Sequence, residues 1–199
     1  MSGDMTFDRV SEAGGGRWRT RDIVVAATVG VVFGFVFWAW NVLWNTLVAP
    51  ASVVAPLWGF LTYGVWLVPA VLAPLIVRRP GAALFAEMVA AGVSAFLPGN
   101  VWGPDVLLSG LVQGAAAEVV FAMTLYRSWS WPTLSLAAVA SAAAAWIHDW
   151  VVWYPDTTTD VQVLRGVAMA VSAVIIVAFG SLAVERTLRR AGVLEGFPG

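Results

Sequence analysis

Six long apolar runs, separated by short breaks, constrain the fold of this chain more than any other feature. They cover residues 22–45, 56–77, 81–98, 105–127, 132–153 and 162–188. A helix needs about 20 mostly apolar residues to cross the hydrocarbon core of a bilayer. Each run meets or approaches that length, although 81–98 ends in a proline–glycine turn and could form a short or partly broken helix. We therefore predict an all-α integral membrane protein, a bundle of six transmembrane helices.

The composition agrees with this class and excludes several others. The chain is 60% hydrophobic and 12% charged, whereas a soluble domain is about 25% charged. It has no cysteine, which excludes disulfides and thiolate metal sites. All 11 basic residues are arginine, so no lysine Schiff base can form and a retinal protein is excluded. The single histidine excludes a multi-histidine metal or haem site, and the chain has no nucleotide-binding loop and no nucleophile elbow.

The distribution of the arginines predicts how the six helices are oriented in the membrane. Cytoplasmic loops carry an excess of basic residues, and with six spans ten of the 11 arginines fall on one side, leaving only Arg165 on the other. We therefore predict that both termini are cytoplasmic. Residues 1–21 are expected to form a disordered cytoplasmic tail that lacks the apolar region of a cleavable signal. Residues 22–190 form the transmembrane domain, and residues 191–199 form a cytoplasmic C-terminal tail.

Two glutamates lie inside the apolar runs, at Glu87 and Glu118. A charged side chain at the bilayer centre costs about 2.5–3.5 kcal/mol on insertion scales, so such a residue indicates function. Gly110, Gly114 and Glu118 recur every four residues and share one helix face, where small residues allow close approach of a neighbour. We expect both acids to face a shared interior, although either could instead only bridge helices by hydrogen bonding. Gln113 is open between helix packing and ligand contact.

The tryptophans gather towards the predicted outer side of the membrane. Nine of the 12 map there: Trp38, Trp40, Trp44, Trp58, Trp66, Trp102, Trp146, Trp150 and Trp153. An interfacial aromatic belt explains any single one, but such a belt should be more even between the two interfaces. An outward-facing aromatic pocket with carboxylates at its floor explains the whole set. Such a pocket suits a flat, cationic or amine-bearing ring.

Further polar and aromatic residues of the outer half complete the candidate substrate-binding site. Asp149 follows His148 near the outer end of the fifth run, where both could simply be interfacial, and Asn100 could be only a turn residue. The candidate site comprises Glu87, Glu118, Gln113, Asn100, Trp102, Trp38, Asn41, Trp146, Asp149 and Tyr63.

Short motifs in a fixed order give the chain a resemblance to the YkoE family. They are WRTRDIV at 18–24 running on to FWAWN at 37–41, FAE at 85–87, PGNVWG at 98–103, GLVQG at 110–114 and EVVFA at 118–122. The resemblance covers about residues 17–190. It implies that residues 22–190 are a six-helix substrate-binding domain, with Glu87, Asn100, Trp102, Gln113 and Glu118 at the matched positions.

Proteins similar to this family are substrate-capture (S) components of energy-coupling factor (ECF) transporters, which are ABC importers of vitamins in prokaryotes. The resemblance implies a multi-pass protein of the cell membrane that captures thiamin or its hydroxymethylpyrimidine precursor from outside. It also implies two kinds of partner, a transmembrane coupling protein and cytosolic ATPase subunits. Ala26, Gly30 and Gly34 could form the coupling surface, or could equally serve ordinary packing within the bundle.

Three alternatives stay open. The same scaffold could bind another cationic or heteroaromatic vitamin. An intramembrane enzyme could use His148 with Asp149, Glu87 or Glu118 as acid–base groups, but no partner nucleophile or usual second metal ligand accompanies them. A purely structural subunit would leave the outer tryptophans and the buried acids unexplained. We expect no enzyme activity, no catalytic residue, no metal or cofactor, and no nucleic acid partner.

Overall fold

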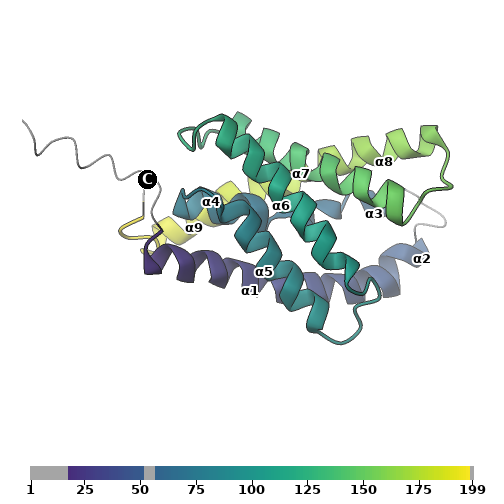
Figure 1. Cartoon of the computed structure of the whole chain (residues 1–199), viewed down its shortest axis with the longest axis horizontal. Helices are drawn as coiled ribbons and strands as arrows, with labels where there is room; N and C mark the ends of the chain where they lie inside the picture. The colour runs from purple at the N-terminus through teal and green to yellow at the C-terminus, as the bar shows by residue number, and fades with distance from the viewer. Residues whose placement is uncertain (1–17, 52–56, 198–199) are drawn as a thin grey trace, which may run out of the picture.

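The computed structural model describes residues 18–51 and 57–197 as a bundle of helices that run along a common direction (Figure 1). In chain order the helices are α1 (Thr20–Leu43), η1 (Trp44–Val48), α2 (Ala49–Ala51), α3 (Leu57–Phe60), η2 (Tyr63–Leu67), α4 (Pro69–Val77), α5 (Ala82–Phe96), α6 (Asp105–Met123), α7 (Trp131–Val152), α8 (Thr159–Ser172), η3 (Ala173–Phe179) and α9 (Gly180–Arg190). The π-helical segments η1 and η3 join their neighbours into two long helices. Most of the expected N-terminal tail, residues 1–17, lies outside the described residues.

The six apolar runs form six helical segments, so the predicted all-α bundle is confirmed. In the described part of the chain, five segments are long and apolar enough to cross a membrane. The sixth, α5, has 15 residues, which at 1.5 Å per residue makes it about 22 Å long. The chain continues beyond α5 through a loop at residues 97–104 before α6 begins, in agreement with the short helix expected there.

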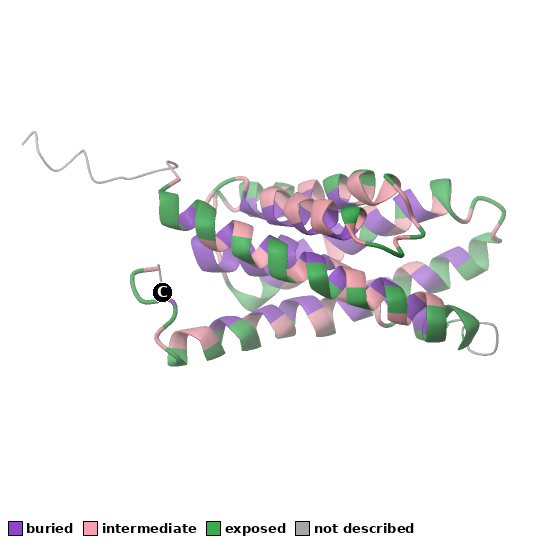
Figure 2. Cartoon of the chain, turned by 90° about the horizontal axis from the view of Figure 1, so that it is seen from below, coloured by how far each residue is buried: buried purple, intermediate pink, exposed green. Residues whose placement is uncertain are grey.

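Helix α4 occupies the middle of the bundle. All nine of its residues are buried, and it contacts α1, α5, α6, α7 and α9. Around it, α5 packs between α1 and α6, and α6 packs on α7. Figure 2 shows the buried residues turned towards the interior of the bundle and the exposed ones on its outer faces. These outer faces carry large apolar side chains such as Val32, Phe35 and Ile175, as a lipid-facing surface requires.

The second apolar run, expected as one helix, is interrupted. After α3 it turns into the 3₁₀ helix η2, and α4 begins at Pro69, whose ring presets the first helical turn. Backbone groups at membrane depth must find partners within the protein. The N–H of Gly64 donates to Ser172 Oγ at 2.8 Å, and the N–H of Ala70 donates to Glu87 Oε2 at 3.0 Å. Side chains of α8 and α5 therefore stabilise the break.

Both ends of the described chain lie at one end of the bundle (Figure 1). The Arg21 guanidinium lies 5.0 Å from the centre of the Phe197 ring, and Arg79 Nε donates to Asp22 Oδ2 at 2.8 Å. We call this the arginine-rich end, after Arg21, Arg78 and Arg79. An even number of spans brings the termini to the same side, and the positive-inside rule assigns this side to the cytoplasm.

The small residues of α1 face into the bundle. A Cβ atom on Gly30 would lie 2.7 Å from Val89 Cβ, and one on Gly34 would lie 2.4 Å from Val93 Cβ. Ala26 is fully buried in the core. The stripe that was a candidate coupling surface is therefore an internal packing face in this structure, chiefly against α5, and a partner could reach it only if α1 moved.

We predict that Gly34→Ala destabilises the protein, because the new Cβ would collide with Val93 and force α1 away from α5. Overpacking of this kind typically costs about 1–3 kcal/mol, which should lower the Tm of the detergent-purified protein by several degrees. Gly92→Ala is the matched control. A Cβ at Gly92 meets nothing within 4 Å, and alanine favours a helix, so its Tm should hold or rise. Equal Tm values for the two variants would contradict the close α1–α5 contact.

Candidate functional site

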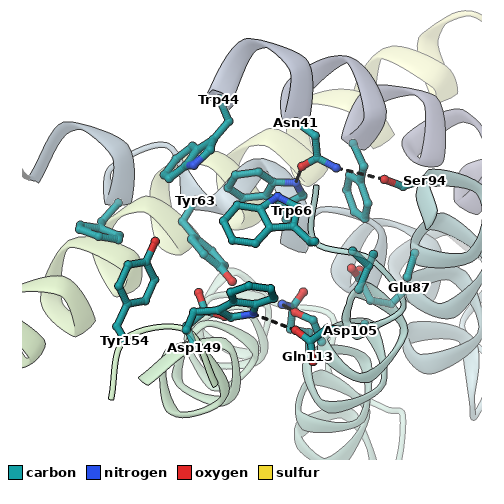
Figure 3. A pocket seen from close by; sticks show the side chains of 18 residues that line it. Asn41, Trp44, Tyr63, Trp66, Glu87, Ser94, Asp105, Gln113, Asp149 and Tyr154 are labelled. Carbon is teal, nitrogen blue, oxygen red and sulfur yellow. Dashed lines mark hydrogen bonds between the residues drawn. The ribbon is translucent and has the colours of Figure 1, made fainter. Parts of the chain in front are cut away.

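A pocket lies inside the bundle, towards the end opposite the arginine-rich end. Figure 3 shows its lining from close by. Its lining residues come from the end of α1 and the start of η1, the interrupted second run, α5, the α5–α6 loop, the first half of α6, and the end of α7 with the residues that follow it. They are Phe37, Asn41, Trp44, Phe60, Tyr63, Trp66, Glu87, Ala91, Ser94, Trp102, Asp105, Val106, Ser109, Gly110, Gln113, Asp149, Trp153 and Tyr154. Its volume is about 80 Å³. The pocket therefore joins segments that are far apart in the sequence.

Aromatic rings form much of the wall. The Trp66 ring centre lies 5.0 Å from that of Trp44 and 5.1 Å from that of Tyr63, with the rings edge-to-face. Trp102, in the α5–α6 loop, meets Trp153 at 4.9 Å, also edge-to-face. Such pairs add about 0.5–1.5 kcal/mol beyond the burial of their area. The rings therefore hold one another in place and give the pocket a preformed aromatic lining.

Asn41 ties three segments together at the pocket. Its Oδ1 accepts a hydrogen bond from Trp66 Nε1 at 3.0 Å, and its Nδ2 donates to Ser94 Oγ at 3.2 Å. The side chain is buried, with the residue 4% exposed. These two bonds link α1 to η2 and to α5 and fix the orientation of the Trp66 ring, as Figure 3 shows.

Glu87 is the acid deepest in the site, at 1% exposed. Its Oε2 accepts the N–H of Ala70 in the first turn of α4, where the helix dipole favours a negative charge. Its Oε1 is buried and has no hydrogen-bond partner in the described part of the protein. Because buried polar atoms are almost always paired, this oxygen indicates a place for a donor group on a bound molecule.

Two aspartates of the lining contact a histidine that lies behind them. His148 Nε2 lies 3.2 Å from Asp105 Oδ1, and His148 Nδ1 lies 3.1 Å from Asp149 Oδ1. Trp153 Nε1 also donates to Asp105 Oδ2 at 2.8 Å. These contacts connect the start of α6 to the end of α7 across one side of the pocket.

A buried arginine stands behind the aromatic wall. Arg165, on α8, is 2% exposed. Its guanidinium lies 3.8 Å from the centre of the Tyr154 ring and 4.4 Å from that of Phe60, and its Nη1 donates to Gln162 Oε1 at 3.1 Å. Cation–π contacts of this kind stabilise a desolvated arginine by about 2 kcal/mol. Arg165 therefore braces two rings that line the pocket.

The structure brings six of the ten sequence-predicted site residues to the lining: Asn41, Tyr63, Glu87, Trp102, Gln113 and Asp149. Gln113 donates through Nε2 to Ser109 Oγ at 2.6 Å, so a side chain that could have served only packing does face the pocket. The lining also includes residues that the sequence did not single out. Asp105, Ser109 and Gln113 recur every four residues on α6, which is a signal that could have found the first two.

Four predicted residues lie outside the lining, and all four bind backbone groups. Trp38 Nε1 donates to the carbonyl of Pro98 at 2.7 Å, and Trp146 Nε1 donates to that of Gln162 at 2.9 Å. Asn100 bonds to backbone groups within and beside its own loop, including the N–H of Trp102. These three side chains hold the scaffold around the pocket.

Glu118, the fourth, lies towards the arginine-rich end. Its carboxylate accepts the N–H groups of Gly81 at 2.5 Å and Ala83 at 2.9 Å, and the hydroxyl of Tyr126 at 2.7 Å. Burial and this hydrogen bond raise the pKa of Tyr126 above its usual value, which keeps the hydroxyl a donor at neutral pH. Of the two roles that the sequence left open for Glu118, these contacts support the bridging of helices.

Comparison with known proteins gives a consistent picture. Residues 21–144 match a family model described as the permease component of an ABC-type cobalt transport system. The chain is 33% identical over 180 residues to a protein of Bacillus subtilis (strain 168) provisionally named HMP/thiamine permease protein YkoE, covering 90% of this chain and 88% of that protein. It matches a solved structure, described as the crystal structure of an S-component of an ECF transporter, with a TM-score of 0.84 and 33% identity over 90% of each chain.

The fold, the pocket and these similarities define a multi-pass membrane protein that binds and transports rather than catalyses, the S component of an ECF transporter. An S component works with an energising module, so a partner of that kind is implied for this chain. The identity to YkoE, over nine tenths of this chain, is high enough to place it more narrowly. The chain belongs to the YkoE family, as its motifs predicted.

We predict that Glu118→Gln lowers stability and leaves ligand affinity unchanged. The carboxylate accepts from three donors, and an amide replaces one acceptor oxygen by an NH₂ group that cannot accept. Leaving a buried donor unpaired costs about 1–3 kcal/mol, so the Tm should fall by several degrees. Tyr126→Phe removes one donor and should have the smaller effect. A Glu118→Gln variant with wild-type Tm and weakened ligand binding would place Glu118 in the pocket instead.

Proposed function

We propose that this protein captures thiamin or its hydroxymethylpyrimidine moiety in the pocket and passes it to the energising module. The observation that carries the proposal is the unpaired Oε1 of Glu87, buried against an aromatic lining. An aminopyrimidine is a flat ring with an exocyclic amine. The ring would stack on indole faces, and the amine would donate to the free carboxylate oxygen.

The size of the pocket supports a seat for the pyrimidine. One buried water needs about 10–15 Å³ of cavity, so a space of about 80 Å³ is several times that minimum. A space of this size suits a small ring better than whole thiamin. In this arrangement the pyrimidine lies next to Glu87, and the thiazolium of thiamin extends towards Trp102 and Trp153, where ring faces suit a cation.

The position of the pocket supports capture from outside. The pocket lies away from the arginine-rich end, which the positive-inside rule assigns to the cytoplasm. Delivery to the inside then requires energy from elsewhere, because the chain contains no nucleotide-binding loop. The partners in this proposal are a transmembrane coupling protein and cytosolic ATPase subunits. The name of the Bacillus subtilis relative, an HMP/thiamine permease protein, agrees with the ligand.

A cobalt ion is the second candidate ligand, because the matching family model is described by cobalt transport. Within residues 18–51 and 57–197, no group of three or more His, Asp or Glu side chains is arranged to hold a metal ion. Divalent cobalt binds best to several nitrogen and oxygen ligands at once. The aromatic lining favours an organic ring over a metal ion, and another heteroaromatic vitamin remains the closer alternative.

We predict that hydroxymethylpyrimidine and thiamin quench the tryptophan fluorescence of the purified protein saturably at micromolar or lower concentrations. Glu87→Gln should weaken both by about tenfold or more, because an amide NH₂ would face the ligand amine as donor against donor. Glu195→Gln changes an exposed glutamate at the arginine-rich end and should leave the affinity unchanged. A competition panel with other heteroaromatic vitamins and Co²⁺ tests the alternatives. Saturable quenching by one of those, with none from thiamin or hydroxymethylpyrimidine, would reject the proposed substrate.

A further inference from the structure

The only histidine of the chain, His148, lies between two carboxylates that line the pocket. Its Nε2 faces Asp105 from α6 at 3.2 Å, and its Nδ1 faces Asp149 from α7 at 3.1 Å. His148 is 9% exposed and is not itself part of the lining. The two aspartates thus face a ligand on one side and the imidazole on the other.

With both aspartates as carboxylates, the two contacts require a proton on each ring nitrogen. A carboxylate accepts hydrogen bonds and cannot donate them, whereas a neutral imidazole carries one N–H donor and one acceptor nitrogen. In the neutral form, one ring nitrogen would direct its lone pair at a carboxylate oxygen. The imidazolium donates from both nitrogens, so it alone satisfies the geometry around His148.

The other ionisable groups of this region are Tyr63 from η2, Tyr154 from the α7–α8 loop and Arg165 from α8. Tyr63 faces Asp149 (Figure 3), and Arg165 is held between the Tyr154 and Phe60 rings. Arg165 therefore adds a buried positive charge behind the Tyr154 and Phe60 rings of the lining. Glu87 differs, because its partner is the uncharged N–H of Ala70.

We propose that His148 is a specificity-determining positioning residue, whose imidazolium holds Asp105 and Asp149 across α6 and α7 and offsets their charge as the ligand experiences it. The inference rests on the proposed function, because it concerns how this pocket chooses among aminopyrimidine ligands. Because the negative charge of the two aspartates is offset, recognition of the ligand depends on the hydrogen bond to Glu87 and on stacking. A positive charge on the ligand then adds little to its affinity. The pocket thereby accepts the neutral pyrimidine as well as cationic thiamin.

The charge state can be measured directly, because the chain has a single histidine. The protein, freed of any polyhistidine tag and labelled with ¹⁵N-histidine, should show both ring nitrogens protonated at about pH 7, where an unperturbed histidine is mostly neutral. A neutral tautomer at that pH would overturn the proposal. This measurement needs no ligand, so its outcome is independent of whether thiamin is the substrate.

The effect on selectivity is tested with His148→Gln, which keeps a side-chain donor and removes the positive charge. The ratio of thiamin affinity to hydroxymethylpyrimidine affinity should rise by about tenfold, because the pocket gains one net negative charge in a low-dielectric site. Arg127→Gln removes the same charge from an exposed position at the arginine-rich end and should not change the ratio.

The double variant His148→Gln/Asp105→Asn separates charge from structural damage. It removes one positive and one negative charge, so the affinity ratio should return towards the wild-type value even if both affinities fall. A purely structural role of His148 would weaken both ligands together and leave the ratio unchanged in the single variant. That outcome would overturn the selectivity claim, whereas failure of both ligands to bind the wild-type protein would count against the proposed function instead.

Discussion

The hydrogen bond between the N–H of Ala70 and Glu87 Oε2 is the interaction on which the site depends. Helix α4 begins inside the bundle and not at a membrane surface, so its first turn has no water to satisfy its N–H groups. Pro69 has no N–H to satisfy, and Glu87 takes that of Ala70. Irregular backbone persists at membrane depth where it is buried in protein or lines a cavity, and here it does both. The irregular backbone at the break in the second apolar run therefore also forms part of the pocket.

Each of the two membrane-embedded glutamates accepts backbone N–H groups at the start of a helix. Glu87 accepts an N–H at the start of α4, and Glu118 accepts N–H groups of Gly81 and Ala83 at the start of α5. Both use the affinity of a helix N-terminus for negative charge. They differ in whether both carboxylate oxygens have hydrogen-bond partners. Both oxygens of Glu118 have partners, whereas one oxygen of Glu87 has none in the described part of the chain.

That difference explains why the sequence could predict the bundle but only part of the site. The length and spacing of the apolar runs predict the six helices, and the excess of tryptophans on the outer side predicts an aromatic pocket. The choice of Trp44 and Trp66 over Trp38 and Trp146 depends on the rotation of each helix and on which indole N–H a carbonyl already binds. The distinct fates of the two glutamates depend on where α4 is interrupted, and a run of apolar residues does not reveal that position.

The hydrogen-bond and ion-pair partners of the acidic residues suggest how a pocket inside a membrane protein can be selective. Asp22 pairs with Arg79, and Glu185 pairs with Arg189. Asp105 and Asp149 each lie within hydrogen-bond distance of a ring nitrogen of His148, so each of these acids has a partner. Among the buried carboxylate oxygens of the described residues, only Glu87 Oε1 is left without a hydrogen bond. A ligand that enters the pocket gains most by supplying the donor missing there, since paired groups offer little further stabilisation. In the proposed function, selectivity for a ring with an amine at one edge would follow from this one unpaired atom, which the hydrogen bond of Glu87 to the start of α4 holds in place.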